Sequence, residues 1–233
     1  MVKEQAHTVK SYEQELTQLR GMTSAMGRLV ERQSALAIAA IVDRDEQASR
    51  EAQALDPQVD ALERDVEALA IRLLALRAPM AGDLREIVSV LKITGDLERI
   101  GDCAASVAKR ARKVEAQPTD VPVGGLRAMG RLVHENLCRA IDAMARRDSE
   151  GAVAVWYSDA AIDELYTAMF RELVTYMMED PRTIRSCTHL LFIAKNLERI
   201  GDHATNIAER VYYAATGEML PADRPRGSAK AAK

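Results

Sequence analysis

The stretch Leu-Glu-Arg-Ile-Gly-Asp occurs twice in this chain, at residues 97–102 and again at residues 197–202. An internal repeat is the first feature to interpret in a sequence, because it indicates that one structural unit has been duplicated. Each copy carries a glutamate at its second position and an aspartate at its sixth. The repeat therefore predicts a duplicated site as well as a duplicated scaffold.

Shorter matches extend the repeat to about 100 residues per half. They pair Asp45 with Asp148, Asp56 and Asp60 with Asp159 and Asp163, and Pro79 with Pro181. Apolar side chains recur in steps of three and four at Leu190, Ile193, Leu197, Ile200, Ala204, Ile207 and Val211, and the residues 100 positions earlier form the same stripe. This spacing is typical of a helix with one buried face.

We therefore expect an all-α fold of two tandem three-helix bundles, with six long antiparallel helices related by a pseudo-twofold internal duplication. The first repeat is expected at residues 1–117, the second at residues 118–217, and a disordered basic tail at residues 218–233. Pro79 and Pro181 are expected to separate the second and third helices of each half, since proline disfavours helix at the residue before it.

Composition narrows the class of protein. Of 233 residues, 48% are hydrophobic but only 4% are aromatic, which favours helices packed through small side chains. A net charge of −3 argues against a protein that coats nucleic acid. The three cysteines form no Cys-x-x-Cys pair, and no apolar run approaches the roughly 20 residues of a membrane span. We expect a soluble, cytoplasmic protein with no nucleic-acid partner and no direct membrane insertion.

The paired acids form the candidate site. With Leu97 at the centre of the buried stripe, Glu98 lies about 100° and Asp102 about 140° around the helix, so both are expected at the edge of the stripe and turned away from the core. Antiparallel packing predicts that these acids face Asp56 and Asp60 across one groove. The corresponding acids of the second half are Glu198, Asp202, Asp159 and Asp163.

Like charges four residues apart destabilise a helix by about 0.2–0.5 kcal/mol per pair, so four such pairs favour a bound cation. Oxygen ligands suit hard ions such as Mg, Ca and Mn, and also iron. The alternative interpretation is a solvated acidic face without metal.

The two halves are not identical. In the second half the acidic stripe continues through Asn206 and Glu209, with His203 beside it. The first half has Lys109 where the second has Glu209, and Cys103 where it has His203. We therefore expect the second-half site to bind metal more tightly.

Glycine and proline raise two further expectations. Gly101 and Gly201 lie in the middle of predicted helices, where glycine costs about 1 kcal/mol relative to alanine, so a neighbouring helix is expected to approach closely there. Pro57 is expected inside a helix, with a kink, because its counterpart Ala160 shows no break.

The chain resembles the PhoU family of phosphate-regulation proteins over roughly residues 8–217. The matching stretches are Asp60, residues 78–85, 96–102 and 162–164, and Asn-Leu-Glu-Arg-Ile-Gly-Asp-His-Ala-Thr-Asn-Ile-Ala-Glu at residues 196–209. The resemblance implies two three-helix bundles whose Glu/Asp-xxx-Asp motifs bind multinuclear iron, or zinc, manganese or magnesium. Those motifs fall on Glu98 and Asp102, Glu198 and Asp202, Asp56 and Asp60, and Asp159 and Asp163.

The role implied by the resemblance is negative regulation of the phosphate-starvation response. Such a protein links the ATPase subunit of the phosphate ABC transporter to a membrane sensor histidine kinase, and restrains both when phosphate is plentiful. A homodimer is also expected.

Two other classes of function compete with this role. Di-iron enzymes built on helical bundles use Glu-x-x-His motifs in the core, and the chain has this motif only at Glu4 and His7. His134 and His189 lie on predicted helices without an acid at metal-binding spacing and are interpreted as packing or surface residues. The remaining alternative is a metal-independent helical adaptor for another signalling pathway.

Overall fold

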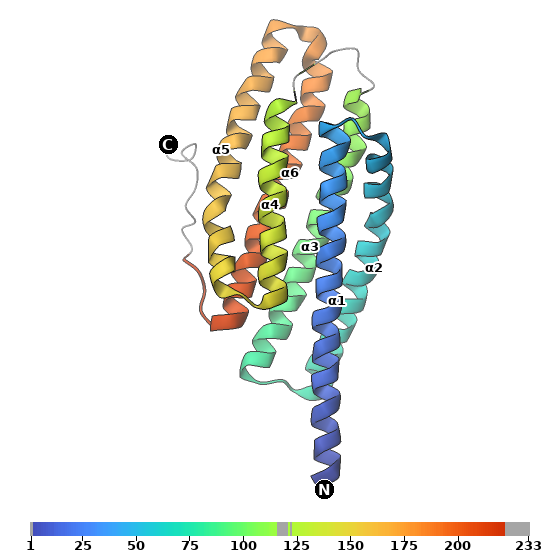
Figure 1. Cartoon of the computed structure of the whole chain (residues 1–233), viewed down its shortest axis with the longest axis vertical. Helices are drawn as coiled ribbons and strands as arrows, with labels where there is room; N and C mark the ends of the chain where they lie inside the picture. Colours follow the sequence, from blue (N-terminus) through green and yellow to red (C-terminus); the bar gives the residue numbers. More distant parts are fainter. Residues whose placement is uncertain (1, 116–120, 122, 222–233) are drawn as a thin grey trace.

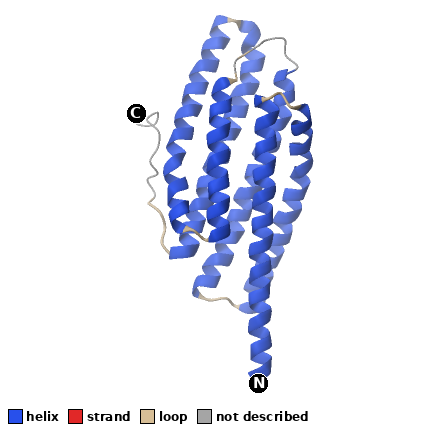
Figure 2. Ribbon diagram, in the orientation of Figure 1, coloured by secondary structure: helices blue, strands red, loops and turns tan. Residues whose placement is uncertain are grey.

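Figure 1 shows the computed structural model, which describes residues 2–115, 121 and 123–221. The six long helices are α1 (Val2–Val42), α2 (Glu46–Arg77), α3 (Ala81–Glu115), α4 (Gly124–Arg146), α5 (Ser149–Glu179) and α6 (Ile184–Thr216), with a short 3-10 helix, η1, at Pro181–Thr183. Every regular element in this part of the chain is helical (Figure 2). The all-α prediction, with three helices per half, is confirmed.

The first turn of the second helix is built in the same way in each half. Asp45 caps α2 by accepting a hydrogen bond from the Ala48 backbone N–H at 2.9 Å. Its counterpart Asp148 caps α5 by accepting hydrogen bonds from two backbone N–H groups. The residues before them, Arg44 and Arg147, both adopt the left-handed conformation, with φ of 55° and 56°. The sequence match between the two aspartates thus reflects a repeated capping function.

The predicted proline breaks are present. Helix α2 ends at Arg77 and α3 begins at Ala81, with Pro79 between them. Pro181 opens η1, between the end of α5 and the start of α6. Helix α2 runs through Pro57, as the repeat predicted. Residues 116–120 and 122, at the expected boundary between the two repeats, and residues 222–233 of the expected tail lie outside the described residues.

The halves meet along two helix pairs. Helices α1 and α4 lie side by side, α3 packs on α6, and in the described residues α2 and α5 each contact only helices of their own half (Figure 1). One hydrophobic core runs through both halves and includes Leu97 and Ile100 of α3 together with Leu197 and Ile200 of α6. The two bundles therefore share one interior.

Two helical glycines, Gly101 and Gly201, lie where a neighbouring helix approaches closely. A Cβ atom on Gly101 would lie 3.3 Å from Val59 of α2, and one on Gly201 would lie 2.8 Å from Ile162 of α5. The close approach predicted at both glycines is confirmed, and it occurs at corresponding places in the two halves. As a result, the acids next to each glycine on α3 and α6 lie beside those of α2 and α5.

None of the described helices has the combination of length and apolar character that a membrane-spanning helix requires.

A second, smaller cluster of buried side chains lies where α1, the end of α2 and the start of α3 extend beyond the shared core, and includes Leu19, Leu73 and Ile87.

Candidate functional site

The first carboxylate cluster lies between α2 and α3. Burial raises the pKa of Asp56, and the charges of Asp102 and Asp60 raise it further, whereas a hydrogen bond from Gln33 at 3.1 Å acts in the opposite direction. The acids of the two helices therefore lie close enough to repel one another. This is the arrangement expected from antiparallel packing.

The α3 side of this cluster contains its own ion pairs. Burial raises the pKa of Glu98, and so does the neighbouring carboxylate of Asp102. The guanidinium of Arg99 lies 3.3 Å from Glu98 and 3.5 Å from Asp102, which offsets part of the repulsion. Glu63 of α2 adds another negative charge, and its own pKa is raised by burial and by Glu67 and Asp60. Glu63 was missed in the sequence, although it lies one helical turn after Asp60.

The second cluster lies between α5 and α6 and is more enclosed. Burial is the main reason that the pKa of Glu198 is raised, and the charges of Asp202 and Asp163 raise it further. The ammonium of Lys195 forms an ion pair with Glu198 and acts in the opposite direction. Asp159 is also buried.

The prediction that the acids turn away from the core is wrong for two of them. Glu198 is 8% exposed and Asp159 is 7% exposed. The reason is the close packing of α5 on α6 at Gly201, which covers the inner acid of each pair. The outer acids Asp163 and Asp202 remain half-buried at the edge of the groove.

Asn206 lies in the seam between the two halves. Its amide nitrogen donates to Asp96 of α3 at 3.1 Å, and Nδ1 of His203 lies 2.8 Å from the same carboxylate oxygen. Asn206 therefore faces the first half, whereas Glu198 faces α5. Glu209, one turn further along α6, is half-buried.

The donor chemistry of both clusters suits a hard cation, although no three described ligand atoms of either cluster lie within 4.8 Å of one another. Each consists of carboxylate oxygens on two facing helices, with pKa values raised by burial and by a repulsion that a bound cation would relieve. In the second cluster the Lys195 ammonium already supplies a positive charge, and the corresponding residue of the first half is Gly95. A metal ion in the second cluster would therefore have to compete with Lys195.

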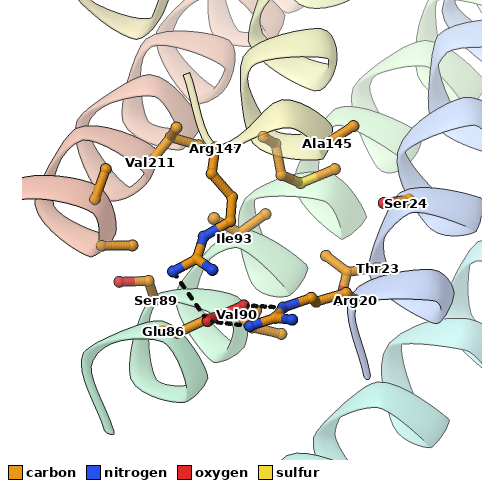
Figure 3. Close-up of a pocket in the computed structure, with 13 residues that line it drawn as sticks. Arg20, Thr23, Ser24, Glu86, Ser89, Val90, Ile93, Ala145, Arg147 and Val211 are labelled. Carbon is orange, nitrogen blue, oxygen red and sulfur yellow. Dashed lines mark hydrogen bonds and ion pairs between the residues drawn. The ribbon is translucent and has the colours of Figure 1, made fainter. Parts of the chain in front are cut away.

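An ion-pair network around one buried carboxylate, that of Glu86, was not apparent from the sequence. Arg20 of α1 contacts both carboxylate oxygens of Glu86, one of them at 2.8 Å, and Arg147 contacts the same carboxylate at 3.2 Å (Figure 3). Glu86 is 6% exposed. The three side chains line a pocket of about 80 Å³ between the halves. The network ties α1 and α3 to the turn that connects α4 with α5.

His134 has an acid nearby, but that acid belongs to another helix and so does not appear in the spacing along its own helix. Its ring lies beside Cys138 of α4 and Glu31 of α1, and the three ligand atoms are within 4.8 Å of one another. Helical spacing places Cys138 one turn from His134, but no sequence signal indicates that Glu31, about 100 residues earlier, packs against them. In the described part of the chain, this is the one group of three or more His, Cys, Asp or Glu residues whose ligand atoms are that close.

Comparison with known proteins agrees with this architecture. The PhoU domain family matches the chain twice, at residues 23–111 and 126–211. The phosphate-specific transport system accessory protein PhoU homolog of Caulobacter vibrioides (strain NA1000 / CB15N) is 50% identical over 94% of this chain and 96% of its own length. The homolog of the same name in Zymomonas mobilis is 44% identical over 95% of this chain and 93% of its own length.

Two solved structures share the fold. The crystal structure of PhoU from Pseudomonas aeruginosa superposes with a TM-score of 0.86 at 41% identity, covering 89% of this chain and all of that one. The phosphate transport system regulatory protein PhoU from Streptococcus pneumoniae superposes with a TM-score of 0.82 at 29% identity, covering 90% of this chain and 99% of that one. With both repeats matched and close relatives aligned over almost their full length, the chain belongs to the PhoU family.

Proposed function

We propose that this protein is a cytoplasmic, non-enzymatic regulator that represses the phosphate-starvation response and phosphate uptake when phosphate is plentiful. It acts by linking the ATPase subunit of a phosphate ABC transporter to a membrane sensor histidine kinase, and it works as a homodimer.

The observation that carries this proposal is the family match over both repeats. The relatives that align over nearly their whole length carry the name of a phosphate-specific transport system accessory protein. The Streptococcus pneumoniae protein of the same fold is titled a regulatory protein of phosphate transport. A protein with an accessory or regulatory function acts by contacting other proteins. Such a function does not require a chemical step.

The two carboxylate clusters supply a metal-binding function within this proposal. Iron, zinc, manganese or magnesium would be held in the second half by Asp159, Asp163, Glu198 and Asp202, and in the first half by Asp56, Asp60, Glu98 and Asp102. The metal would neutralise the repelling carboxylates and so fix α2 on α3 and α5 on α6. The raised pKa values of Asp56, Glu98 and Glu198 support this function, because burial and then mutual repulsion disfavour the ionised carboxylates, and a bound cation would offset that cost.

A phosphate-starvation reporter in cells that lack this protein tests the regulatory role. In medium rich in phosphate, the reporter is expected to be active in the deletion strain and silent once the gene is restored. A reporter that stays silent in the deletion strain would contradict the proposal. Capture of proteins by the purified full chain would then search for a different partner.

A pair of variants separates the metal-dependent regulator from a metal-independent adaptor. The double variant Glu198→Gln with Asp202→Asn removes two charges from the second cluster and keeps the side-chain shapes. The matched control is Glu172→Gln, an exposed acid on α5 outside the cluster. If the metal matters, the double variant folds but fails to silence the reporter, whereas the control silences it. Equal repression by both variants would favour the metal-independent adaptor.

A further inference from the structure

Three side chains of different chemistry meet on the seam between α1 and α4. The thiol of Cys138 lies 3.2 Å from a carboxylate oxygen of Glu31 and 3.6 Å from Nε2 of His134. All three residues are half-buried, so they are shielded from bulk solvent but not sealed from it. Nδ1 of His134 is buried and has no hydrogen-bond partner among the described residues, so the ring makes its polar contact through Nε2.

The separations match those of ligands around one metal ion. Sulfur, nitrogen and oxygen ligands of tetrahedral zinc lie about 2.0–2.3 Å from the metal, which places any two of them about 3.3–3.7 Å apart. The two distances from the Cys138 sulfur, 3.2 and 3.6 Å, are close to this range without any movement of the helices. The Glu31 oxygen and the His134 ring nitrogen lie within 4.8 Å of one another, so a single ion between the three groups would need only small side-chain adjustments to meet all of them.

The donor set differs from that of the carboxylate clusters. A thiolate, an imidazole and one carboxylate are the ligands that zinc and similar borderline metals prefer, whereas Mg and Ca favour sites made entirely of oxygen. Burial is the largest contribution that raises the pKa of Cys138 to about 12, and the negative charges of Glu31 across the seam and Asp142 on the same helix raise it further. The local field therefore favours a cation.

The position of the group gives a bound metal a structural consequence. Helix α1 runs antiparallel to α4, and the two approach closely where Gly27 meets Ile141 and where Gly130 meets Ile38 (Figure 1). On α1, Glu31 lies between Gly27 and Ile38. On α4, His134 and Cys138 lie between Gly130 and Ile141. Glu31 comes from the first half, whereas His134 and Cys138 come from the second. A metal bound here would join the two halves of the molecule directly.

We propose that Glu31, His134 and Cys138 form a binding site for one divalent metal ion of the zinc class, with solvent as the fourth ligand. Binding forms one bond each from the metal to sulfur, nitrogen and oxygen, and the thiol proton leaves to solvent. The site is separate from the carboxylate clusters, which lie between α2 and α3 and between α5 and α6. It does not depend on the proposed regulatory function.

Cobalt titration of the chelator-treated full chain tests this site directly, because Co²⁺ bound to a thiolate gives a near-ultraviolet charge-transfer absorption that oxygen ligands do not give. The wild-type protein is expected to develop this absorption with one Co²⁺ per chain, and added zinc is expected to remove it. Cys138→Ser is expected to abolish it. Cys103→Ser and Cys187→Ser remove the other two free cysteines and are expected to leave it unchanged.

Zinc affinity provides the second measurement. His134→Ala is expected to weaken zinc binding at this site by more than about 100-fold, since loss even of residues that merely support a metal ligand weakens binding by 10- to 100-fold. The control His189→Ala changes a half-buried histidine on α6 outside the group. Circular dichroism of each variant before titration shows whether it is folded.

Three outcomes would overturn the proposal: no charge-transfer absorption in the folded wild-type protein, an absorption that survives Cys138→Ser, or one that disappears in Cys103→Ser instead. The last result would place the thiolate ligand at Cys103, a buried residue of α3 in the shared core. A folded Cys138→Ser protein that has lost the absorption, together with weakened zinc binding in His134→Ala, supports the site.

Discussion

At the scale of single residues, the acids show how helical spacing and packing contribute differently to a site. The spacing of four residues places Glu198 and Asp202 on one side of α6 whatever surrounds them. Their burial depends on the neighbouring helix, and α5 covers Glu198 more than Asp202 because it packs tightly at Gly201. Two acids one turn apart on the same helix therefore have different environments.

Gly201→Ala is expected to destabilise the protein. The added methyl group would lie 2.8 Å from Cδ1 of Ile162, so that buried side chain must shift, at a cost of about 1–3 kcal/mol that the higher helix propensity of alanine offsets only in part. The measurement is the free energy of unfolding in urea. Gly95→Ala is the matched control on α3, because a methyl group added there would have no atom of a neighbouring helix within 4 Å. This control is expected to be stabilised by about 0.5–1 kcal/mol, through the higher helix propensity of alanine. Equal stability changes in the two variants would show that close packing at Gly201 has no energetic effect.

At the scale of the helices, the repeated caps explain why the two halves begin their second helix in the same way. Asp148 accepts from the backbone N–H groups of Glu150 and Gly151, both at 3.0 Å. These groups would otherwise lack partners in the first turn of α5. The aspartates of the repeat therefore serve two purposes, capping at Asp45 and Asp148 and clustering of charge further along the same helices.

Asp148→Ala is expected to lower the free energy of unfolding by about 1 kcal/mol, the usual effect of removing a helix cap. The thermal midpoint and urea denaturation both measure it. The matched control is Asp43→Ala, which removes an exposed ion pair with Arg127 and no cap. Its expected effect is below about 0.5 kcal/mol. A larger loss in the control than in the cap variant would contradict the capping assignment.

The long end of α1 is tied to α2 by a carboxylate whose pKa is lowered. Hydrogen bonds from Arg77 and from Arg72 lower the pKa of Glu15 below its ordinary value of 4.5. A lowered carboxylate pKa stabilises the folded state above the unfolded pKa, and this stabilisation is lost as the pH falls through the folded pKa. The ion pairs of Glu15 with Arg72 and Arg77 are thus expected to weaken only at acidic pH.

Glu15→Gln is therefore expected to destabilise the protein by about 0.5–1 kcal/mol at pH 7, the range for a partly exposed ion-pair network. The difference from the wild type should shrink as the pH falls below 4.5. Thermal unfolding at a series of pH values measures it. Glu13→Gln, an exposed acid on the same helix, is the control. A difference that stays constant down to low pH would mean that the ionised carboxylate does not stabilise the fold.

At the scale of the whole molecule, the two repeats behave as parts of one structure. They share a continuous core, and polar contacts cross between them where Asp96 meets His203 and where Glu86 meets Arg147. A half separated from its partner would expose the apolar faces of α1 and α3, or of α4 and α6. Neither repeat is therefore expected to keep its structure alone.

Unfolding of the full chain is expected to follow one cooperative transition. Trp156 is the single tryptophan and is buried in the second half, so its fluorescence reports on that half. Circular dichroism reports on the helices of both halves. Coincident midpoints of the two signals in urea are expected for one cooperative unit. A fluorescence midpoint that differs from the circular dichroism midpoint would show that the halves unfold separately.

Reading the chain alone was enough to predict the six helices, their boundaries at Pro79 and Pro181, the duplication, and the acids that face one another in each half. These features depend on the spacing of apolar residues along each helix and on the repeated motifs. Both can be seen directly in the amino-acid sequence. The PhoU resemblance stated from the same motifs is confirmed by both domain matches.

Only the tertiary structure shows which side chains from distant helices come together. The burial of Asp159 and Glu198, the contact of Asn206 with Asp96, and the meeting of Glu31 with Cys138 all depend on how one helix is rotated and placed against another. That placement is set by the close-packed glycines and the shared core, which sum many small contacts between residues about 100 positions apart. No local pattern in the chain carries that information.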